Sequence, residues 1–328
     1  MSATTTTTLV AMVVVVIAIA TAVSVEAAPS VETANGTFRF ASYYGDHMVL
    51  QREPSGAFVW GFGNPGARVV VVLYRAGGSA EGPGIPVQRH EANVSTGLGT
   101  WSVTLKPTVA GGPYSLEATE LEAPGDRGRG RGRGRGLRVT LSDLLFGDVW
   151  LCGGQSNMEM TVKQVGGGWG GGGGTVPIGL VQSCWGGTPV EAWSSPQALA
   201  RCGLHAPHAP ARAARPARPA RARSPQAHSV LWNAMIHPLL NMSLRGVVWY
   251  QGEENTQVNP DLYNCTFPAM VDDWRSSFHA GTHGATNPVL PFGFAQSADR
   301  GYCPNGRMPG TFMAVTLDLC DRKSPYGM

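Results

Sequence analysis

The sequence predicts an α/β domain with a parallel sheet, incomplete in places, preceded by a small antiparallel β-sandwich-like domain. Residues 38–120 hold short β-rich runs separated by closely spaced glycine and proline, without a helical period of useful length. Such punctuation is typical of antiparallel sandwiches and barrels. After residue 137 the apolar runs are continuous and further apart, as buried strands of a parallel sheet are.

The elements follow in this order. "GAFVWGFG", "ARVVVVLYRAGG" and "TWSVTLKP" are β runs of the first domain, which we bound at 38–120. An Arg/Gly segment at 121–137 separates it from the second domain, 138–328. Strands of that domain are predicted within 148–154, 178–187, 246–255 and 312–321, and a helix within 229–244, where apolar residues have helical spacing. Low-complexity inserts without regular structure are predicted at 166–174 and 206–225.

The N-terminal segment 1–28 resembles a signal peptide. Leu9 to Ala20 is an apolar stretch followed by small residues, and it is too short to span a bilayer comfortably. A membrane anchor is the alternative, and no other segment of the sequence is apolar enough to span a membrane. Glycosylation sequons begin at Asn35, Asn93, Asn241 and Asn264. We therefore expect a secreted or lysosomal protein that is free of the membrane after signal removal.

Charge and cysteine content restrict the partners. The net charge is +3, but ten arginines lie in the tracts 127–136 and 206–225, and without them 15 basic residues face 22 acidic ones. The body is acidic, so a nucleic-acid-binding surface is not predicted. RNA binding by the arginine tracts is a weaker hypothesis, since a secreted chain seldom meets RNA.

Six cysteines allow 15 disulfide connectivities. No Cys/His cluster has metal-ligand spacing, so neither a metal nor another cofactor is expected.

The stretch "GDVWLCGGQSNMEM", 147–160, places Ser156 between a buried strand and a helical pattern. Ser156 could be a helix N-cap or a nucleophile at a tight turn. Its surroundings are not the G-x-S-x-G elbow of the α/β-hydrolases. Polar residues or glycines also close the other predicted strands. They are Gly186 and Gly187, Gln251, Glu253 and Asn255, and Asp318 and Asp321.

In open α/β sheets the ligand site lies at the carboxyl ends of the strands. Because all these residues are expected at that edge, the nucleophile role of Ser156 is favoured over the N-cap role. A serine hydrolase also needs donors for the oxyanion. The amide of Ser156, the amide of Gly186 or Gly187, and the Asn255 side chain could be those donors. The alternatives are a turn requirement for the glycines and a helix cap for Asn255.

Long blocks of the sequence resemble, in order, the animal sialate O-acetylesterase family, which belongs to the SGNH (GDSL-like) hydrolases. They include "GDVWLCGGQSNM", "PIGLVQSCWGGTPVEAWSS", "VLWNAMIHPL", "GVVWYQGEEN", "DLYNCTFPAMVDDWR" and "TFMAVTLDLCDRKSPYG". The resemblance implies a flavodoxin-like SGNH domain with an accessory β-sandwich. It implies a metal-free serine esterase that removes acetyl groups from O-acetylated sialic acids, with Ser156 as nucleophile and Gly186 or Gly187 and Asn255 at the oxyanion.

The sequence also departs from the family. It resembles a truncated and internally deleted member: a glycine run stands where part of the sheet is expected, and the Ile-His-Pro block that carries the family's base does not appear after "DRKSPYG". Asp318 or Asp321 would be the acid, and Glu253 and Gln251 would support the site through hydrogen bonds. His237 is a weak candidate base, more readily a core residue. We expect weak or no esterase activity, and the alternative is a non-catalytic glycan-binding or vestigial secreted protein.

Overall fold

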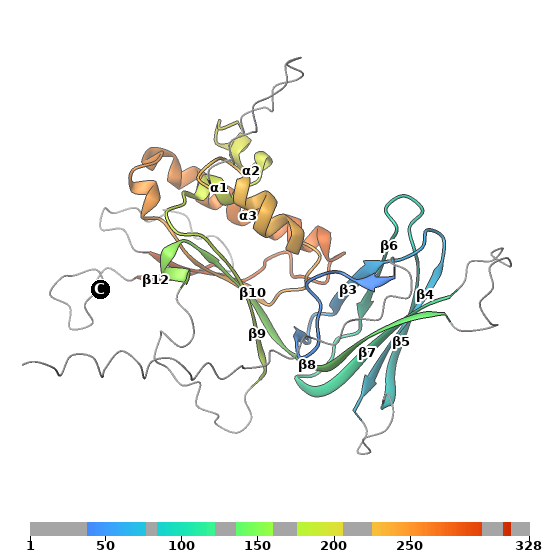
Figure 1. Cartoon of the computed structure of the whole chain (residues 1–328). Coiled ribbons are helices and arrows are strands. Elements are labelled where there is room, and N and C mark those ends of the chain that lie inside the picture. Colours follow the sequence, from blue (N-terminus) through green and yellow to red (C-terminus); the bar gives the residue numbers. More distant parts are fainter. Residues whose placement is uncertain are drawn as a thin grey trace, which may run out of the picture. The chain divides into compact units, whose positions relative to one another are not determined.

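The computed structural model describes residues 38–76, 84–121, 136–159, 176–205, 225–296 and 311–315. All of them belong to one compact unit, Asn35–Met328 (Figure 1). The predicted signal peptide, Asn35, the tract 166–174, Asp318 and Asp321 lie outside these residues. The Arg/Gly segment and the tract 206–225 lie almost wholly outside them.

The described strands form two sheets. The smaller has the order β1-β3-β6, from Arg39–Phe40, Ala57–Phe62 and Thr100–Leu105, and is antiparallel. The larger has the order β12-β11-β10-β8-β7-β4-β5, with β2 and β9 also paired to β8. Its strands are β2 (Val49–Gln51), β4 (Arg68–Arg75), β5 (Ile85–Asn93), β7 (Gly111–Leu121), β8 (Leu137–Gly154), β9 (Ile178–Cys184), β10 (Gly246–Tyr250), β11 (Phe292–Gln296) and β12 (Thr311–Val315).

The antiparallel strands enclose the first core. In β4, Val69, Val71 and Leu73 are buried in alternation, and they join Val59 and Trp101 of the smaller sheet in one hydrophobic cluster. Alternation with period two is what a strand needs to bury one face. The antiparallel runs expected between residues 57 and 121 are therefore present. That they form a separate domain stays a prediction, because β8 continues beyond them.

Strand β8 joins the antiparallel and parallel parts of the larger sheet. Residues Leu137 to Phe146 pair antiparallel with β7, and Asp148 to Gly154 pair parallel with β9 and β10. The sequence had suggested a shorter strand at 148–154 alone. The first half of the strand was missed because it follows directly after the arginine-rich segment. In the structure the strand extends over all 18 residues.

The parallel part has the order β9-β8-β10-β11-β12. The strands predicted within 178–187, 246–255 and 312–321 correspond to β9, β10 and β12. Strand β11 was missed because it is short and Gly293 interrupts its apolar run. The helix predicted at 229–244 is instead a π-helical turn, η2 (Trp232–Ile236), followed by a 3₁₀ turn, η3 (His237–Leu239). Pro238 has no N–H to donate, which prevents a regular α-helix.

Helices α1 (Val190–Trp193), α2 (Pro196–Arg201) and α3 (Tyr263–Gly281) gather on one face of the parallel strands (Figure 1). They form a second core with the strand residues Leu151, Val247 and Trp249, all fully buried. The Ser195 hydroxyl caps α2 by accepting a hydrogen bond from the Ala198 amide. A disulfide between Cys202 and Cys265 joins the end of α2 to the first turn of α3.

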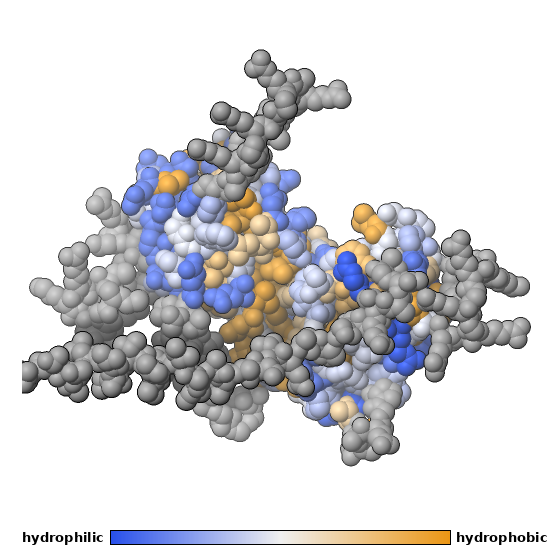
Figure 2. Space-filling model, viewed as in Figure 1, coloured by the Kyte–Doolittle hydropathy of each residue, from blue (hydrophilic) through white to orange (hydrophobic). Residues whose placement is uncertain are grey.

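The other face of the parallel strands carries exposed apolar side chains. Leu180 on β9 and Val248 on β10 are about half exposed, at 49% and 40%, and Figure 2 shows hydrophobic residues gathered over these strands. Within the described ranges, no helix has both the length and the apolar character needed to cross a membrane.

Candidate active site

The turn after β8 presents Ser156 at the carboxyl end of the strand. Gly154 has φ +137°, and a Cβ on it would lie 2.1 Å from the Tyr250 carbonyl oxygen, so the position requires glycine. The next amide, Gln155, donates to that same carbonyl. Ser156 then begins the 3₁₀ turn η1 (Ser156–Glu159) and is exposed. An N-cap is the residue that precedes the first helical residue. Ser156 is instead the first residue of the turn.

Gly186 lies directly beside Ser156. The end of β9 is fixed to the turn by a hydrogen bond from the Trp185 amide to the Gly154 carbonyl, 3.0 Å. A Cβ built on Gly186 would lie 3.4 Å from the Ser156 Cβ. The Gly186 amide donates to the carboxylate of Glu159. A backbone donor therefore lies near the serine, and its hydrogen bond is taken up by a carboxylate.

Gly187 matches the turn alternative instead. Its φ is +63°, no atom lies within 4 Å of a Cβ built on it, and its carbonyl accepts a hydrogen bond from Gln226. The loop is anchored further on by Thr188, whose hydroxyl donates to the Trp185 carbonyl and accepts from the Trp193 indole. The positive φ of residue 187 by itself favours glycine at this position.

The Asn255 side chain, a candidate oxyanion donor from the sequence, makes its hydrogen bonds inside the protein. The side chain is buried, and its Nδ2 donates to Glu191 Oε2 at 2.9 Å and to the Val258 carbonyl at 3.0 Å. Its Oδ1 accepts from the Val190 amide and from Gln251 Nε2. All four bonds lie within the protein, so Asn255 ties the loop after β10 to the start of α1.

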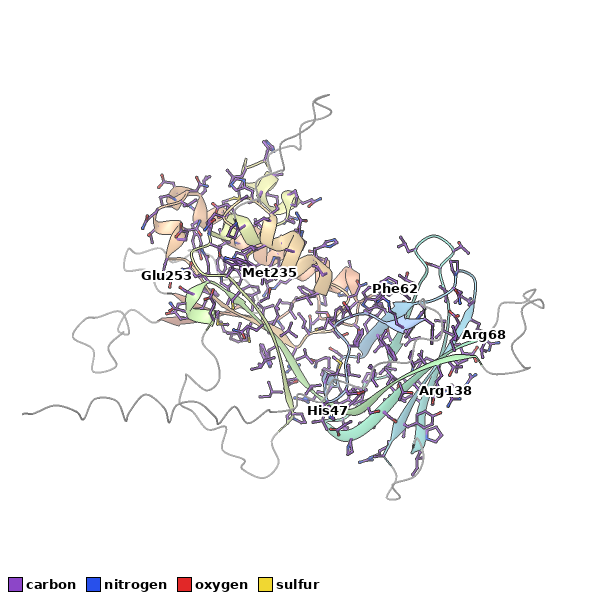
Figure 3. All side chains as sticks on the ribbon, in the orientation of Figure 1. His47, Phe62, Arg68, Arg138, Met235 and Glu253 are labelled. Atoms are coloured by element: carbon purple, nitrogen blue, oxygen red, sulfur yellow. A yellow bond between two sulfur atoms is a disulfide. The ribbon has the colours of Figure 1, made fainter. Side chains whose placement is uncertain are left out.

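Gln251 and Glu253 have separate roles in this loop. Gln251 is buried and donates to the Thr188 carbonyl as well as to Asn255. Glu253 lies beyond the end of β10 (Figure 3), and its Oε1 accepts a hydrogen bond from the Asn157 side chain at 2.9 Å. The predicted support by Glu253 is therefore directed at the residue that follows Ser156.

In the described part of the chain, His237 makes no hydrogen bond to Ser156. It is exposed, with its ring packed edge-on against Trp232 at 6.2 Å between centroids, and so it is not the core residue expected from the sequence. The chain before His237 contacts the end of β9, where the Met235 carbonyl accepts a hydrogen bond from the Ser183 hydroxyl. The chain after it reaches the end of α3, where the Leu240 carbonyl lies 2.5 Å from a Cβ built on Gly281. His237 begins the short 3₁₀ turn η3 and is followed by Pro238, and in this turn its side chain is exposed.

Three site residues were missed from the sequence. Asn157 and Glu159 follow Ser156 in "QSNME". Glu159 is three residues after Ser156, and residues three apart eclipse in a 3₁₀ turn, so its position alone could have drawn attention. Glu191 is fully buried and accepts hydrogen bonds from Asn255 and Asn259. Its sequence position in a short helix gives no signal, because both partners belong to a distant part of the chain, the loop after β10.

Ionisation at this edge is governed by burial. Burial raises the pKa of the Tyr263 phenol far above its usual value, and the charges of Glu253 and Glu191 raise it further. The phenol therefore stays protonated and donates towards Gln251. Burial also raises the pKa of the thiols of Cys152 and Cys184, which makes them poor nucleophiles.

Chemically, the described edge offers a serine hydroxyl, a neighbouring backbone donor and the carboxylates of Glu159, Glu191 and Glu253. Within the described ranges no group of three or more His, Cys, Asp or Glu residues is placed to hold a metal ion. A hydroxyl beside a backbone N–H is the arrangement that acyl transfer uses, because the amide can receive the oxygen that becomes negatively charged.

The comparisons with known proteins agree on one class. A carbohydrate acetylesterase from Xanthomonas citri has a similar structure, with a TM-score of 0.61 and 26% sequence identity over 86% of this chain and 69% of its own. In fold, the chain is thus similar to a carbohydrate acetylesterase. No protein-family model matches the sequence.

Sequence relatives define the family. Sialate O-acetylesterases of Homo sapiens and Pongo abelii are each 39% identical to this chain, over a region that covers 88% of this chain and 67% of theirs. The enzyme of Mus musculus is 36% identical, with 69% of its length covered. The chain belongs to the sialate O-acetylesterase family.

Proposed function

We propose that this chain is a serine carboxylic-ester hydrolase of the SGNH type that acts on O-acetyl esters of sialic acids. The observation that carries the proposal is the position of Ser156, exposed at the end of a parallel strand with the Gly186 amide beside it. The family membership supports the reaction class, and the relatives' names supply the acetylated sialic acid.

In the proposed reaction the Ser156 oxygen attacks the carbonyl carbon of the acetyl group. The ester C–O bond then breaks, the sugar hydroxyl leaves with the proton that the serine gave up, and an acetyl-serine remains. Water adds to this acyl group and releases acetate, which restores the serine. The negatively charged oxygen of each tetrahedral intermediate needs donors at about 2.7–3.1 Å, and we assign this part to the backbone amides of Gly186 and Ser156.

We further propose that turnover by the 328-residue chain is slow. A serine hydroxyl is a weak nucleophile without an adjacent base. Among the described residues no histidine is hydrogen-bonded to Ser156, and the exposed His237 packs its ring against Trp232. The oxyanion donors and substrate binding alone retain about 10³–10⁴-fold over water in well-studied triads. We expect acetate release at that residual level.

The localisation and modification expected from the sequence remain part of the proposal. The Cys202–Cys265 disulfide supports an oxidising compartment, in keeping with a secreted or lysosomal protein. Asn93 and Asn264 are exposed, whereas Asn241 is half-buried. Of these three sequons, the first two are better placed to carry a glycan.

The test is acetate release from O-acetylated sialic acid by the wild type, Ser156→Ala and His237→Ala. We expect weak release that Ser156→Ala abolishes and His237→Ala leaves unchanged. Release that persists in Ser156→Ala would exclude the serine as nucleophile. Saturable binding of the acetylated sugar with no release from any form would instead favour the non-catalytic glycan-binding alternative.

A further inference from the structure

Gly186 lies in contact with both Glu159 and Ser156. The Gly186 N–H donates to Glu159 Oε1. From the position of a Cβ on Gly186, that carboxylate oxygen is 3.2 Å away and the Ser156 Cβ is 3.4 Å away. Because Ser156 and Glu159 are the first and last residues of η1, the 3₁₀ geometry places their side chains on the same side.

A carboxylate oxygen and an oxyanion both accept a hydrogen bond from an amide N–H. Both are negatively charged acceptors, and hydrogen bonds to charged acceptors are stronger than neutral ones. A single N–H cannot serve both at full strength. An acetyl ester that places its carbonyl oxygen at Gly186 must therefore displace the Glu159 carboxylate, which is exposed and can move into water.

We infer that Glu159 is an internal competitor of the substrate: its carboxylate occupies the oxyanion position at Gly186 and holds the site in a self-inhibited state. This inference rests on the proposed function of Ser156 and Gly186. The same position accepts any small carboxylate once Glu159 has left, so the acetate product is a competing ligand of the opened site.

The first experiment measures the rate at which a fluorophosphonate labels Ser156. In that reaction the serine oxygen bonds to phosphorus, fluoride leaves and the hydroxyl proton passes to solvent, while the phosphoryl oxygen needs the same amide donor as the oxyanion. We expect Glu159→Ala to be labelled about tenfold faster than the wild type, the factor expected for losing one exposed charged hydrogen bond. Glu159→Gln keeps an acceptor without the charge and should fall between them.

Matched controls separate this effect from a general loss of negative charge. Glu254→Ala removes one carboxylate from the 3₁₀ turn η4 (Glu254–Thr256), after β10, and should be labelled at the wild-type rate. Ser156→Ala defines the background. If Glu159→Ala and the wild type are labelled equally fast, the inference is wrong, although the proposed function stands.

A second readout does not depend on catalysis. The amide resonance of Gly186 reports its acceptor, so it should move when Glu159 is replaced by alanine and should move back as sodium acetate is added. Acetate should bind Glu159→Ala about tenfold more tightly than the wild type, the counterpart of the labelling factor. If no form is labelled, the proposed function fails, and the acetate titration then tests the inference about Glu159 alone. Tighter acetate binding by Glu159→Ala than by the wild type supports the inference, and equal affinity overturns it.

Discussion

Replacing Asn255 by alanine distinguishes a structural from a catalytic role for this residue. The side chain is 3% exposed, and its amide makes four hydrogen bonds inside the protein. Partners of these bonds are the Val190 amide at 2.8 Å, Gln251 Nε2 at 2.7 Å, Glu191 Oε2 at 2.9 Å and the Val258 carbonyl at 3.0 Å. Alanine removes all four and leaves the Glu191 carboxylate with less compensation.

The expected cost follows from these bonds. A hydrogen bond contributes about 1 kcal/mol net, and a buried partner left unpaired adds about 1–3 kcal/mol. The relaxation of the loop recovers part of this, so we expect Asn255→Ala to lower the free energy of unfolding by about 3–5 kcal/mol. That is a large share of the roughly 5–15 kcal/mol of an ordinary domain. Urea denaturation monitored by tryptophan fluorescence measures it.

Asn157→Ala is the matched control, because it removes the same group from a half-buried position with one side-chain bond, to Glu253. We expect it to cost about 1 kcal/mol. The labelling rate of Ser156 is measured for both variants in the folded protein. If Asn255→Ala keeps wild-type stability but slows labelling about 100-fold, the size of effect seen for an oxyanion donor, the structural assignment is refuted and the catalytic one restored.

Two further outcomes concern stability. Removing the Cys202–Cys265 disulfide by a double serine replacement opens a link across 63 residues and should cost about 4 kcal/mol in urea denaturation; Cys184→Ser, which breaks no disulfide, is the control, and an equal effect of both would contradict the assignment. Burial raises the pKa of Asp273 above 3.8, partly offset by Ser195 and Arg201. The folded state then holds this proton more tightly than the unfolded state, so unfolding free energy falls as pH rises from about 4 through the raised pKa; Asp273→Asn should flatten that part of the profile, and an unchanged profile would exclude the shift.

The local features of this protein can be predicted from its sequence. The glycines before Ser156, the apolar runs of β9 and β10, and the alternation within β4 are each visible within a short window of sequence, because periodicity and turn chemistry act over that range. Gly154 is a clear case. Its place after an apolar run predicts a tight turn, and the structure gives it a positive φ.

Which side chains lie in contact at the site depends on the arrangement of distant segments. Asn255 closes an apolar strand in the sequence just as an oxyanion donor would, but Glu191 and Val190, from a distant part of the chain, take up its amide. Gly186 lies 27 residues from Glu159, and only the pairing of β8 with β9 brings them together. A side chain's hydrogen-bond partners depend on which segments the sheet places side by side, and no local pattern carries that information.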